Sequence, residues 1–444
     1  MKVQKLPFDP GDSGWARIIP ADAGYPKLTG TQSTDVAVVG AGFAGLSAAK
    51  RLSELNPKAR ITVVEARSIA EGPAGRNSGF MIDVPHNLGS SNYLGTLDDD
   101  RQQISMNREA IEFADEVCNE FSMPSDVFGK PGKINAAATE SGHRHNMSFA
   151  RRLEQLGENY EMLDAGKMKE ITGSDYYRSG IATPQTAVIQ PAAYITGLAR
   201  GLHSCGVEIF ENTPIIDLAR TGDGWRLKTP IASIDAQTVV LAVNGHVESF
   251  GYFNRRLVHI FLYASMTRRL TPDEIHLLGG EARWGLTPSD PFGSTVRRIS
   301  GTSGDRIVIR NGISWAPGRT ISEKRMNSVI RHHQSTFQAR FPQIGDVTME
   351  YQWGGLLCLS RNSVPAFGKL EENLYSACCQ NGLGTTRGTL AGKLIAELIC
   401  GVRSASLEYY LGQAQPKRMP PEPFASIGGN LSLRWGELKA GREK

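Results

Sequence analysis

The hydrophobic pattern near the start of the chain predicts a strand, a helix and a second strand in succession. Residues 36–39 and 61–64 are short apolar runs, and Ala44, Ala48 and Leu52 recur between them at the spacing of one helical face. Unbroken apolar runs of this length are typical of strands buried on both faces of a parallel sheet. The pattern therefore predicts a βαβ unit.

The same reading predicts a series of elements along the rest of the chain. Helices are expected at 96–121, 141–156, 191–202, 322–340 and 385–398, and strands at 207–210, 225–227, 238–243, 258–267, 296–299, 306–309 and 374–379. The run at 238–243, which is apolar after Thr238, is expected at a buried parallel position. The strands between 258 and 309 are expected to pair antiparallel. The chain then returns to the style of its first part, which indicates two units.

Three glycines and one acid give the βαβ unit its expected chemistry. Gly40, Gly42 and Gly45 follow the first strand in G-x-G-x-x-G spacing, and Glu65 ends the second strand. The glycines permit a tight turn, a close approach of the backbone to a pyrophosphate, and close packing of the helix, whose N-terminus favours the anion. A carboxylate at Glu65 accepts from ribose hydroxyls and disfavours a 2′-phosphate, which argues against NADP. We expect a bound dinucleotide rather than a glycine-rich turn without a ligand.

Length and composition narrow the class of protein. The 444 residues suggest two domains or one elaborated domain, and Lys plus Arg exceed Asp plus Glu by only four. The basic residues are scattered, so neither a nucleic acid nor a membrane surface is an expected partner. The six cysteines show no C-x-x-C spacing, no secretory signal precedes them, and no apolar run is long enough to span a bilayer. We expect reduced thiols and a cytoplasmic location, without a membrane span.

The histidines predict no metal site. His332 and His333 are neighbours on an expected helix, so they point to different faces, and a solvated helix face is the favoured interpretation. His86, His246 and His259 lack partners at the spacing of metal ligands and are expected to be structural.

Two further glycine-rich stretches are expected to contact a ligand. Pro73, Gly75 and Gly79 interrupt regular structure directly after the βαβ unit, and the residues between them add donors, which favours a ligand loop over a plain connector. The turn 380–384 precedes the helix at 385–398, which makes a second helix N-terminus available to an anion or dipole. A second nucleotide site is not favoured, because no acidic strand end follows that helix.

With these motifs in place, the chain resembles the FAD-dependent amine oxidases of the D-amino-acid oxidase and glycine oxidase superfamily, and within it the gamma-glutamylputrescine oxidases. The resemblance runs from about residue 34 to 401, and its most specific parts are the loop Ala74-Gly75-Arg76-Asn77-Ser78-Gly79 and the block from Tyr351 to Gly401. It implies an α/β, Rossmann-like FAD-binding domain of the glutathione-reductase type and an α+β substrate domain of antiparallel sheet plus helices. The FAD-binding domain is expected at 34–95, 181–250 and 345–405, the substrate domain at 96–180 and 251–344, an N-terminal arm at 1–33 and a C-terminal tail at 406–444.

The resemblance implies cofactor contacts from six segments. Those near the ADP half of FAD are Gly40, Gly42, Phe43, Ala44, Gly45, Glu65, Ala66 and Arg67. Those along the ribityl chain and flavin ring are Ala74, Gly75, Arg76, Asn77, Ser78 and Gly79. Those beside adenine and the phosphates are Pro214, Ile215, Val243 and Asn244, and those at the flavin carbonyl edge are Gly382, Leu383, Gly384, Thr385 and Thr386.

Two departures from the resembled enzymes affect the expected substrate and acceptor. Glycine oxidases clamp the substrate carboxylate with an arginine after a W-x-G motif, but the stretch here is Trp353-Gly354-Gly355-Leu356-Leu357-Cys358. This favours an amine whose charged group lies far from the reacting carbon. Sarcosine oxidases keep a lysine near the flavin where this chain has Thr386, which puts oxygen activation by that lysine in doubt. The substrate pocket is expected at Tyr263 and Arg298, although alternation turns only one of Arg297 and Arg298 inward, where it would hold a distal carboxylate or phosphonate.

The expected reaction is oxidation of a primary or secondary amine by hydride transfer to flavin N5, giving an imine that hydrolyses to an aldehyde. Oxygen or another acceptor reoxidises the flavin, and no catalytic side chain is identified. The alternatives are an FAD-binding subunit with a decayed substrate site, a flavoprotein dehydrogenase of an N-alkyl amino acid that does not use oxygen, and an NAD-dependent dehydrogenase. FAD is expected to be non-covalent, although sarcosine oxidases attach it through a cysteine that could align near Cys358.

Overall fold

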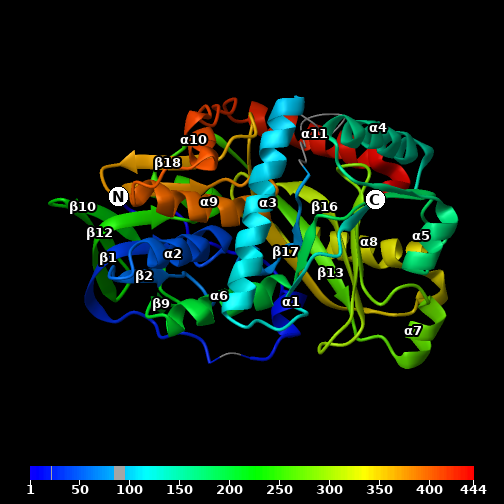
Figure 1. The fold of residues 1–444 in the computed structure, drawn as a ribbon, viewed down its shortest axis with the longest axis horizontal. Coiled ribbons are helices and arrows are strands. Elements are labelled where there is room, and N and C mark those ends of the chain that lie inside the picture. The colour runs from blue at the N-terminus through cyan, green and yellow to red at the C-terminus, as the bar shows by residue number, and fades with distance from the viewer. Residues whose placement is uncertain (22, 85–95) are drawn as a thin grey trace.

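The computed structural model describes residues 1–21, 23–84 and 96–444, and in this part of the chain two eight-stranded sheets form the framework. Figure 1 shows the first sheet on the left and the second on the right, with helix α3 (Leu97–Glu120) near the middle. Each sheet carries its own helices, so the molecule is of the mixed α/β and α+β class that the sequence predicts.

The first sheet has a parallel centre. Its strands run in the order β10-β11-β12-β1-β2-β9, and β19 also pairs with β12. The parallel strands are β1 (Gly30–Val39), β2 (Ile61–Val64), β9 (Glu208–Phe210), β12 (Ala232–Leu241) and β19 (Leu374–Cys378), and the antiparallel ones are β10 (Asp217–Thr221), β11 (Gly224–Lys228) and β18 (Ala366–Glu371). The apolar run expected at a buried parallel position is the last part of β12, which confirms that prediction.

Four helices cover the first sheet and share one hydrophobic core. They are α2 (Phe43–Leu55), α3, α6 (Pro191–Ser204) and α9 (Gly384–Ile399). Helices α2 and α9 approach closely because Gly392 faces the backbone of α2; a Cβ at Gly392 would lie 2.2 Å from the carbonyl oxygen of Ala44. This packing fixes the N-termini of both helices relative to the strand ends.

The second sheet has the order β17-β13-β16-β15-β14-β5-β7-β6 and is largely antiparallel. Its strands are β5 (Lys133–Ala137), β6 (Glu161–Leu163), β7 (Ser179–Thr183), β13 (Leu257–Thr267), β14 (Trp284–Pro288), β15 (Thr295–Ile299), β16 (Arg306–Trp315) and β17 (Met349–Ser360). The helices of this unit are α4 (Glu140–Leu156), α5 (Ala165–Thr172), α7 (Pro272–Leu278) and α8 (Glu323–Arg340). A small third sheet joins β3 (Phe80–Met81), β4 (Phe128–Gly129) and β8 (Ala187–Ile189).

Two segments pack differently from the expected domain boundaries. Strand β17 was assigned to the FAD-binding domain, but it pairs with β13 from Leu257↔Ser360 to Thr267↔Met349 and therefore belongs to the second sheet. Helix α3 was assigned to the substrate domain, but its buried face joins the core of α2, α6 and α9. Helix α3 was predicted with nearly its observed bounds, whereas no strand was predicted over the residues of β17.

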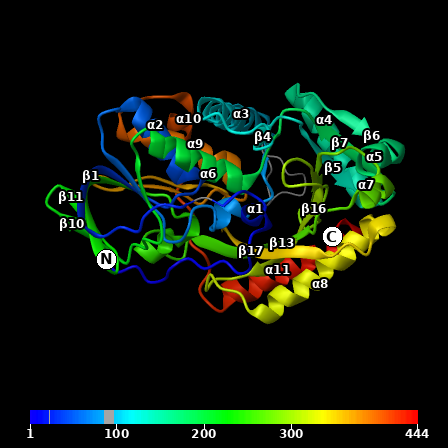
Figure 2. The ribbon, with the colours of Figure 1, turned by 90° about the horizontal axis from the view of Figure 1, so that it is seen from below.

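The two ends of the chain contribute more structure than expected. The N-terminal arm includes α1 (Gly14–Arg17), where Trp15 is buried in the main core. The C-terminal tail forms α10 (Ala405–Gly412) and α11 (Phe424–Ala440), and α11 packs on β16 (Figure 2). The carboxylate of Glu443 then accepts from the backbone N–H groups of Ala138 and Thr139.

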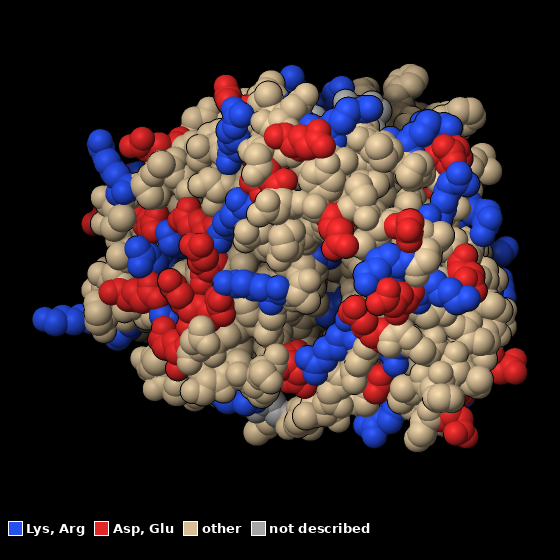
Figure 3. Space-filling view, turned by 45° about the vertical axis from the view of Figure 1, so that its right-hand side comes forward, with Lys and Arg blue, Asp and Glu red and all other residues tan. Residues whose placement is uncertain are grey.

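The face of the molecule in Figure 3 shows how the charged side chains are distributed. Acidic and basic side chains are interspersed on the face in Figure 3. None of the helices in the described ranges is long and apolar enough to cross a membrane.

Candidate active site

The three fingerprint glycines meet different structural requirements in the turn between β1 and α2. Gly40 has a φ of 102°, and a Cβ there would lie 2.7 Å from the carbonyl oxygen of Ala242. A Cβ at Gly45 would lie 1.8 Å from the carbonyl oxygen of Gly40. At Gly42 the nearest atom to an added Cβ is the Cβ of Ala74, at an ordinary 3.5 Å. Gly40 and Gly45 are therefore required by the fold, whereas Gly42 keeps space open beside the turn.

The first turn of α2 is free to bind an anion. Its N-cap residue is Gly42, no side chain of the described residues caps the helix, and no acidic residue lies in its first turn. The N–H groups of a helix N-terminus that lack internal partners, together with the helix dipole, favour a phosphate. Phe43 and Ala44 of this turn border a cavity.

Glu65 stands at the end of β2 with its carboxylate at the same cavity. Oε2 accepts from the N–H of Ala41 at 2.9 Å, and Oε1 accepts from the N–H of Arg67 at 3.1 Å. Burial raises the pKa of the carboxyl group, while these backbone donors act to lower it. The remaining lone pairs suit a pair of ribose hydroxyls, as the sequence predicts.

The loop after β2 is braced by its own polar side chains. The Arg76 guanidinium donates through Nη1 to the carbonyl oxygens of Pro10, Gly11 and Gly354. Asn77 closes the loop locally, because Nδ2 donates to the Ala74 carbonyl at 2.6 Å and Oδ1 accepts from the N–H of Gly79 at 2.8 Å. The expected donors of this loop are thus partly used to shape it, and the loop presents a fixed backbone to the cavity.

The late glycine turn places the start of α9 at the cavity. Gly382 and Gly384 line it, and no side chain of the described residues caps α9. The hydroxyls of Thr385 and Thr386 instead donate to the carbonyl oxygens of Phe80 and Ile82. These two threonines therefore tie the helix to β3 and to the residue that follows it.

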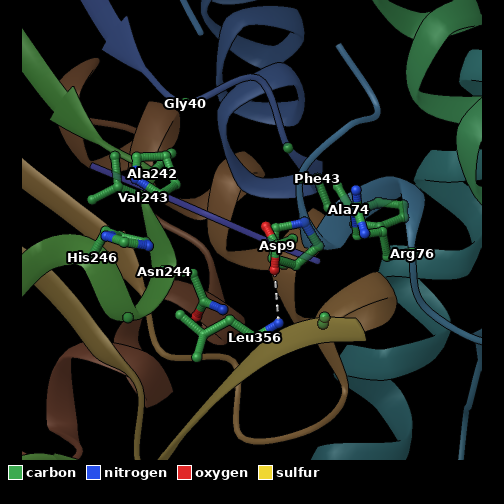
Figure 4. A pocket seen from close by; sticks show the side chains of 18 of the residues that line it. Asp9, Gly40, Phe43, Ala74, Arg76, Ala242, Val243, Asn244, His246 and Leu356 are labelled. Carbon is green, nitrogen blue, oxygen red and sulfur yellow. Dashed lines mark hydrogen bonds between the residues drawn. The ribbon is translucent and has the colours of Figure 1, made fainter. Parts of the chain in front are cut away.

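One continuous cavity joins most of the predicted cofactor residues (Figure 4). Those that line it are Gly40, Gly42, Phe43, Ala44, Glu65, Ala66, Arg67, Ala74, Arg76, Asn77, Ser78, Ile215, Val243, Asn244, Gly382 and Gly384. Those that do not are Gly45, Gly75, Gly79, Pro214, Leu383, Thr385 and Thr386. Several of the second group are packing positions; a Cβ at Gly75, for example, would lie 1.9 Å from the Ala70 carbonyl oxygen.

The N-terminal arm also lines this cavity, which the sequence reading did not predict. The arm residues concerned are Val3, Lys5, Leu6, Pro7 and Asp9. Asp9 is buried, and its Oδ1 accepts from the N–H of Leu356 at 3.0 Å (Figure 4). Its Oδ2 lies 3.6 Å from Arg67 Nη1. The sequence shows only that Asp9 precedes a proline and a glycine in an irregular arm. Its burial could not be predicted, because it depends on contacts with a strand far along the chain.

The far end of the cavity lies against the second sheet. Leu262 and Ala264 of β13, Arg310 of β16 and Leu356 of β17 line it. Tyr263, predicted to bind substrate, borders the cavity, but its hydroxyl donates to Ser314 Oγ at 2.8 Å. Its ring packs in a cluster that includes residues of α8. The Tyr263 hydroxyl is therefore already engaged within the protein.

The structure corrects the predicted role of Arg298. Arg298 does not line the cavity; its guanidinium donates to the Gly279 carbonyl and pairs with Asp305 at 3.4 Å. Arg297 turns the other way and donates through Nη1 to the carbonyl oxygens of Ser78 at 2.7 Å and Ile189 at 2.9 Å. Burial lowers the pKa of Arg297 to about 9. Arg297 therefore braces the loop after β2, and among the described arginines of the second sheet it is Arg310 that lines the cavity.

Arg297 also stacks on aromatic rings, which explains how a charged side chain is accommodated there. Its guanidinium carbon lies 5.0 Å from the centroid of a Trp15 ring and 5.5 Å from that of the Phe80 ring. Contacts of this kind stabilise a cation where water is excluded.

The remaining histidines and cysteines do not form a metal centre within the described ranges. His246 lines the cavity, and burial lowers its pKa to about 3. His259 Nε2 lies 2.7 Å from Glu248 Oε2. His86, which the sequence reading treated as structural, lies outside the described residues. Cys358 is fully buried in β17 and is not among the cavity residues.

Comparison with known proteins gives the same picture. The model of the family DAO, FAD dependent oxidoreductase, matches residues 35–398. The chain is 27% identical over 413 residues to a probable oxidoreductase OrdL of Haemophilus influenzae, covering 86% of each protein, and 24% identical over 383 residues to gamma-glutamylputrescine oxidoreductase of Escherichia coli, covering 85% of this chain and 86% of that one. The crystal structure of glycine oxidase from Geobacillus kaustophilus superposes with a TM-score of 0.70 at 17% identity, covering 88% of this chain and all of that one. The chain therefore belongs to the DAO family of FAD-dependent oxidoreductases.

Proposed function

We propose that this protein uses FAD to oxidise a primary or secondary amine at its C–N bond. One observation carries the proposal: a single cavity extends from the glycine fingerprint of the first sheet to an apolar wall on the second sheet, so cofactor and substrate share one enclosure. The printed names of similar proteins support the reaction class, since one is a gamma-glutamylputrescine oxidoreductase and another a glycine oxidase.

The residues at the first-sheet end fit the ADP half of FAD. The uncapped first turn of α2 would bind the pyrophosphate, and the Glu65 carboxylate the ribose. Asn77, Ser78 and Gly382, which line the same cavity, would lie along the ribityl chain and the flavin ring. The start of α9 would direct its N–H groups at the ring edge.

The second-sheet end supplies the environment of the amine. Bound FAD would accept a hydride from the carbon beside the nitrogen, and the resulting imine would hydrolyse to an aldehyde. Leu262, Ala264 and Leu356 present apolar surface, which disfavours an ammonium and favours the neutral amine with its lone pair. We propose that the chain contributes this dry wall, rather than a strong base, to the reaction.

We propose that α-amino acids are poor substrates. Leu356 and Leu357 occupy the stretch in which glycine oxidases carry the carboxylate-binding arginine, and both line the cavity. A carboxylate directly beside the reacting carbon would find no bidentate partner from this stretch. We propose oxygen or another oxidant as the electron acceptor. Thr386 stands where sarcosine oxidases keep a lysine, and its hydroxyl donates to the Ile82 carbonyl, so the proposal includes no activation of oxygen by an ammonium at this position.

We propose that FAD is held without a covalent bond. The thiol of Cys358 is fully buried, lies outside the cavity lining, and has its pKa raised by burial and by the neighbouring Cys379. A thiol that stays protonated is a weak nucleophile.

An anaerobic amine screen on the purified yellow protein tests this function. Acid precipitation is expected to release FAD into the supernatant, and at least one primary or secondary amine is expected to bleach the flavin absorption while glycine and D-alanine do so poorly. Yellow colour in the acid pellet would contradict the non-covalent assignment. If no amine bleaches the flavin, the protein is better described as an FAD-binding subunit, and a colourless protein active with NAD would overturn the proposal altogether.

A further inference from the structure

Arg310 lines the end of the cavity that is formed by the second sheet. It lies in β16, where it pairs in register with Ala264 of β13 on one side and Thr295 of β15 on the other. Its side chain is partly buried and lines the cavity together with Leu262, Ala264 and Leu356. A guanidinium here is therefore surrounded by apolar side chains and open to a ligand in the cavity.

The charge of Arg310 has no counterpart within the described residues. No hydrogen bond or ion pair of its guanidinium is formed there, whereas the neighbouring Arg297, Arg298 and Arg306 all donate to backbone carbonyls, and Arg298 and Arg306 also pair with acids. Burial lowers the pKa of Arg310 to about 10, so it remains a cation at neutral pH. A desolvated cation without a partner is costly, and such a site is completed by an anion.

The other cations of the cavity are already compensated. Arg67 lies 3.6 Å from Asp9 and 3.3 Å from Glu71, Arg76 donates to three backbone carbonyls, and Lys5 donates to the Gly318 carbonyl. The two phosphates of a bound FAD would lie at the first-sheet end, by the first turn of α2. Arg310 is thus the lining cation of the described chain that an incoming ligand would have to neutralise.

We propose that Arg310 binds an anionic group of the amine substrate, and this inference rests on the proposed amine oxidation. The guanidinium presents a planar fork of donors that matches a carboxylate, phosphonate or sulfonate with two parallel hydrogen bonds. Because the stretch from Trp353 to Cys358 carries no arginine, the anion lies at the end of the substrate away from the reacting carbon. The substrate class is therefore an amine with a distal anion.

A matched substrate series tests this assignment. The series consists of amines with a chain of three to five carbons that carries a carboxylate, phosphonate or sulfonate at the end opposite the nitrogen. Each is compared with the neutral alkylamine of the same length by anaerobic flavin reduction. At least one anionic amine is expected to exceed its neutral partner roughly 100-fold in kcat/KM. In Arg310→Gln that advantage, measured as the ratio of kcat/KM for the anionic amine to kcat/KM for the neutral amine on the same variant, falls roughly 30-fold or more. The matched control Arg298→Gln, on the adjacent strand but outside the cavity, keeps the wild-type preference.

A second measurement reports binding without turnover. Propionate, methylphosphonate and ethanesulfonate, which contain no amine, are titrated into the oxidised holoenzyme while its visible flavin spectrum is followed. A saturable change is expected in the wild-type protein and is lost in Arg310→Gln, while Arg310→Lys, which keeps the charge but not the fork, retains weaker binding. The anion that saturates the spectral change at the lowest concentration identifies the class of anionic group that the site prefers.

The outcomes separate the two proposals. If anionic and neutral amines react equally and Arg310→Gln changes neither reaction nor titration, the inference about Arg310 fails while amine oxidation stands. If no amine reduces the flavin but the anions still titrate in an Arg310-dependent way, the anion site stands and the proposed reaction fails. If Arg310→Gln shifts the spectrum of the ligand-free flavin and leaves anion binding intact, Arg310 contacts the cofactor and the inference is overturned.

Discussion

At the scale of single residues, Gly42 and Gly45 show that one motif combines two kinds of constraint. A Cβ at Gly45 would collide with the Gly40 carbonyl oxygen at 1.8 Å, so this position is set by the packing of the turn itself. A Cβ at Gly42 would meet only the Ala74 Cβ at 3.5 Å, and Gly42 borders the cavity. Gly45 is therefore set by folding, and we expect Gly42 to be set by binding.

Gly42→Val is therefore expected to fold but to lose FAD. The Cβ makes only an ordinary contact with the protein, and we expect the branched side chain to extend into the space proposed for the pyrophosphate, so FAD content is expected to fall at least about tenfold, with the melting temperature of the apoprotein unchanged. Gly45→Ala is the contrasting variant: its apoprotein is expected to melt at a clearly lower temperature, because backbone atoms must move. Absorbance at 450 nm per protein and thermal melting measure both. A Gly42→Val protein with full flavin content would contradict the cofactor site.

Where the signal was local, most of the predicted residues border the cavity, and their cofactor contacts stay predictions. Gly40 and Glu65 were identified from the spacing of the fingerprint, and the loop 74–79 from its glycines and the family resemblance. Arg298 was assigned wrongly because alternation says that one of two adjacent arginines faces inward but not which one. Arg310 was missed because it follows the last residue of the strand predicted at 306–309, whereas the structure extends β16 to Trp315.

At the scale of elements, α8 was predicted with nearly correct bounds but with the wrong surroundings for His333. The sequence favoured a solvated face, yet His333 is fully buried against the second sheet. Its Nδ1 lies 2.7 Å from Ser265 Oγ and its Nε2 lies 3.2 Å from the Asn311 carbonyl oxygen. Burial lowers the pKa of His333 to about 4, so the folded protein keeps this ring neutral.

His333 is expected to make the protein less stable as the pH falls from about 6.5 to about 4. In that range the unfolded chain protonates this histidine and the folded chain does not, so the unfolded state binds more protons and gains stability with acidity; above about 6.5 the effect is absent. Between pH 7.5 and 5 the linkage amounts to about 2 kcal/mol of unfolding free energy. Urea unfolding of the wild type and His333→Gln at the two pH values should show a smaller loss in the variant. His276→Gln, on an exposed position of α7, is the control and should keep the wild-type dependence; an identical dependence in His333→Gln would refute this prediction.

Element bounds were easier to predict than element partners, and α3 shows why. Helical periodicity is a property of a segment, so α3 was recognised, whereas no strand was predicted over the residues of β17. Which sheet β17 joins depends on the edge that β13 offers, and which core α3 joins depends on helices from three distant parts of the chain. No local pattern contains that information.

At the scale of the whole molecule, the N-terminal arm links the two sheets across the cavity. At the first sheet the amino terminus pairs with Asp217 at 2.9 Å, and the N–H of Val3 donates to the Ile216 carbonyl. At the second sheet the Pro10 carbonyl accepts from the N–H of Gly354, and Asp9 accepts from Leu356. The arm thus covers a cavity that both sheets build, and it has few core contacts of its own before α1.

Deleting residues 2–12 is expected to weaken FAD retention without unfolding the protein. The deletion removes the arm residues that line the cavity but leaves α1 and the buried Trp15, so the cores of both sheets keep their contacts. FAD is expected to dissociate at least about tenfold faster, because part of its enclosure is missing. The rate is measured by the rise in free-flavin fluorescence after dilution, with circular dichroism confirming the fold. Asp9→Asn, which keeps the arm but weakens its attachment to β17, should give an intermediate rate. An unchanged dissociation rate in the deletion would show that the arm lies over the cavity without holding the cofactor.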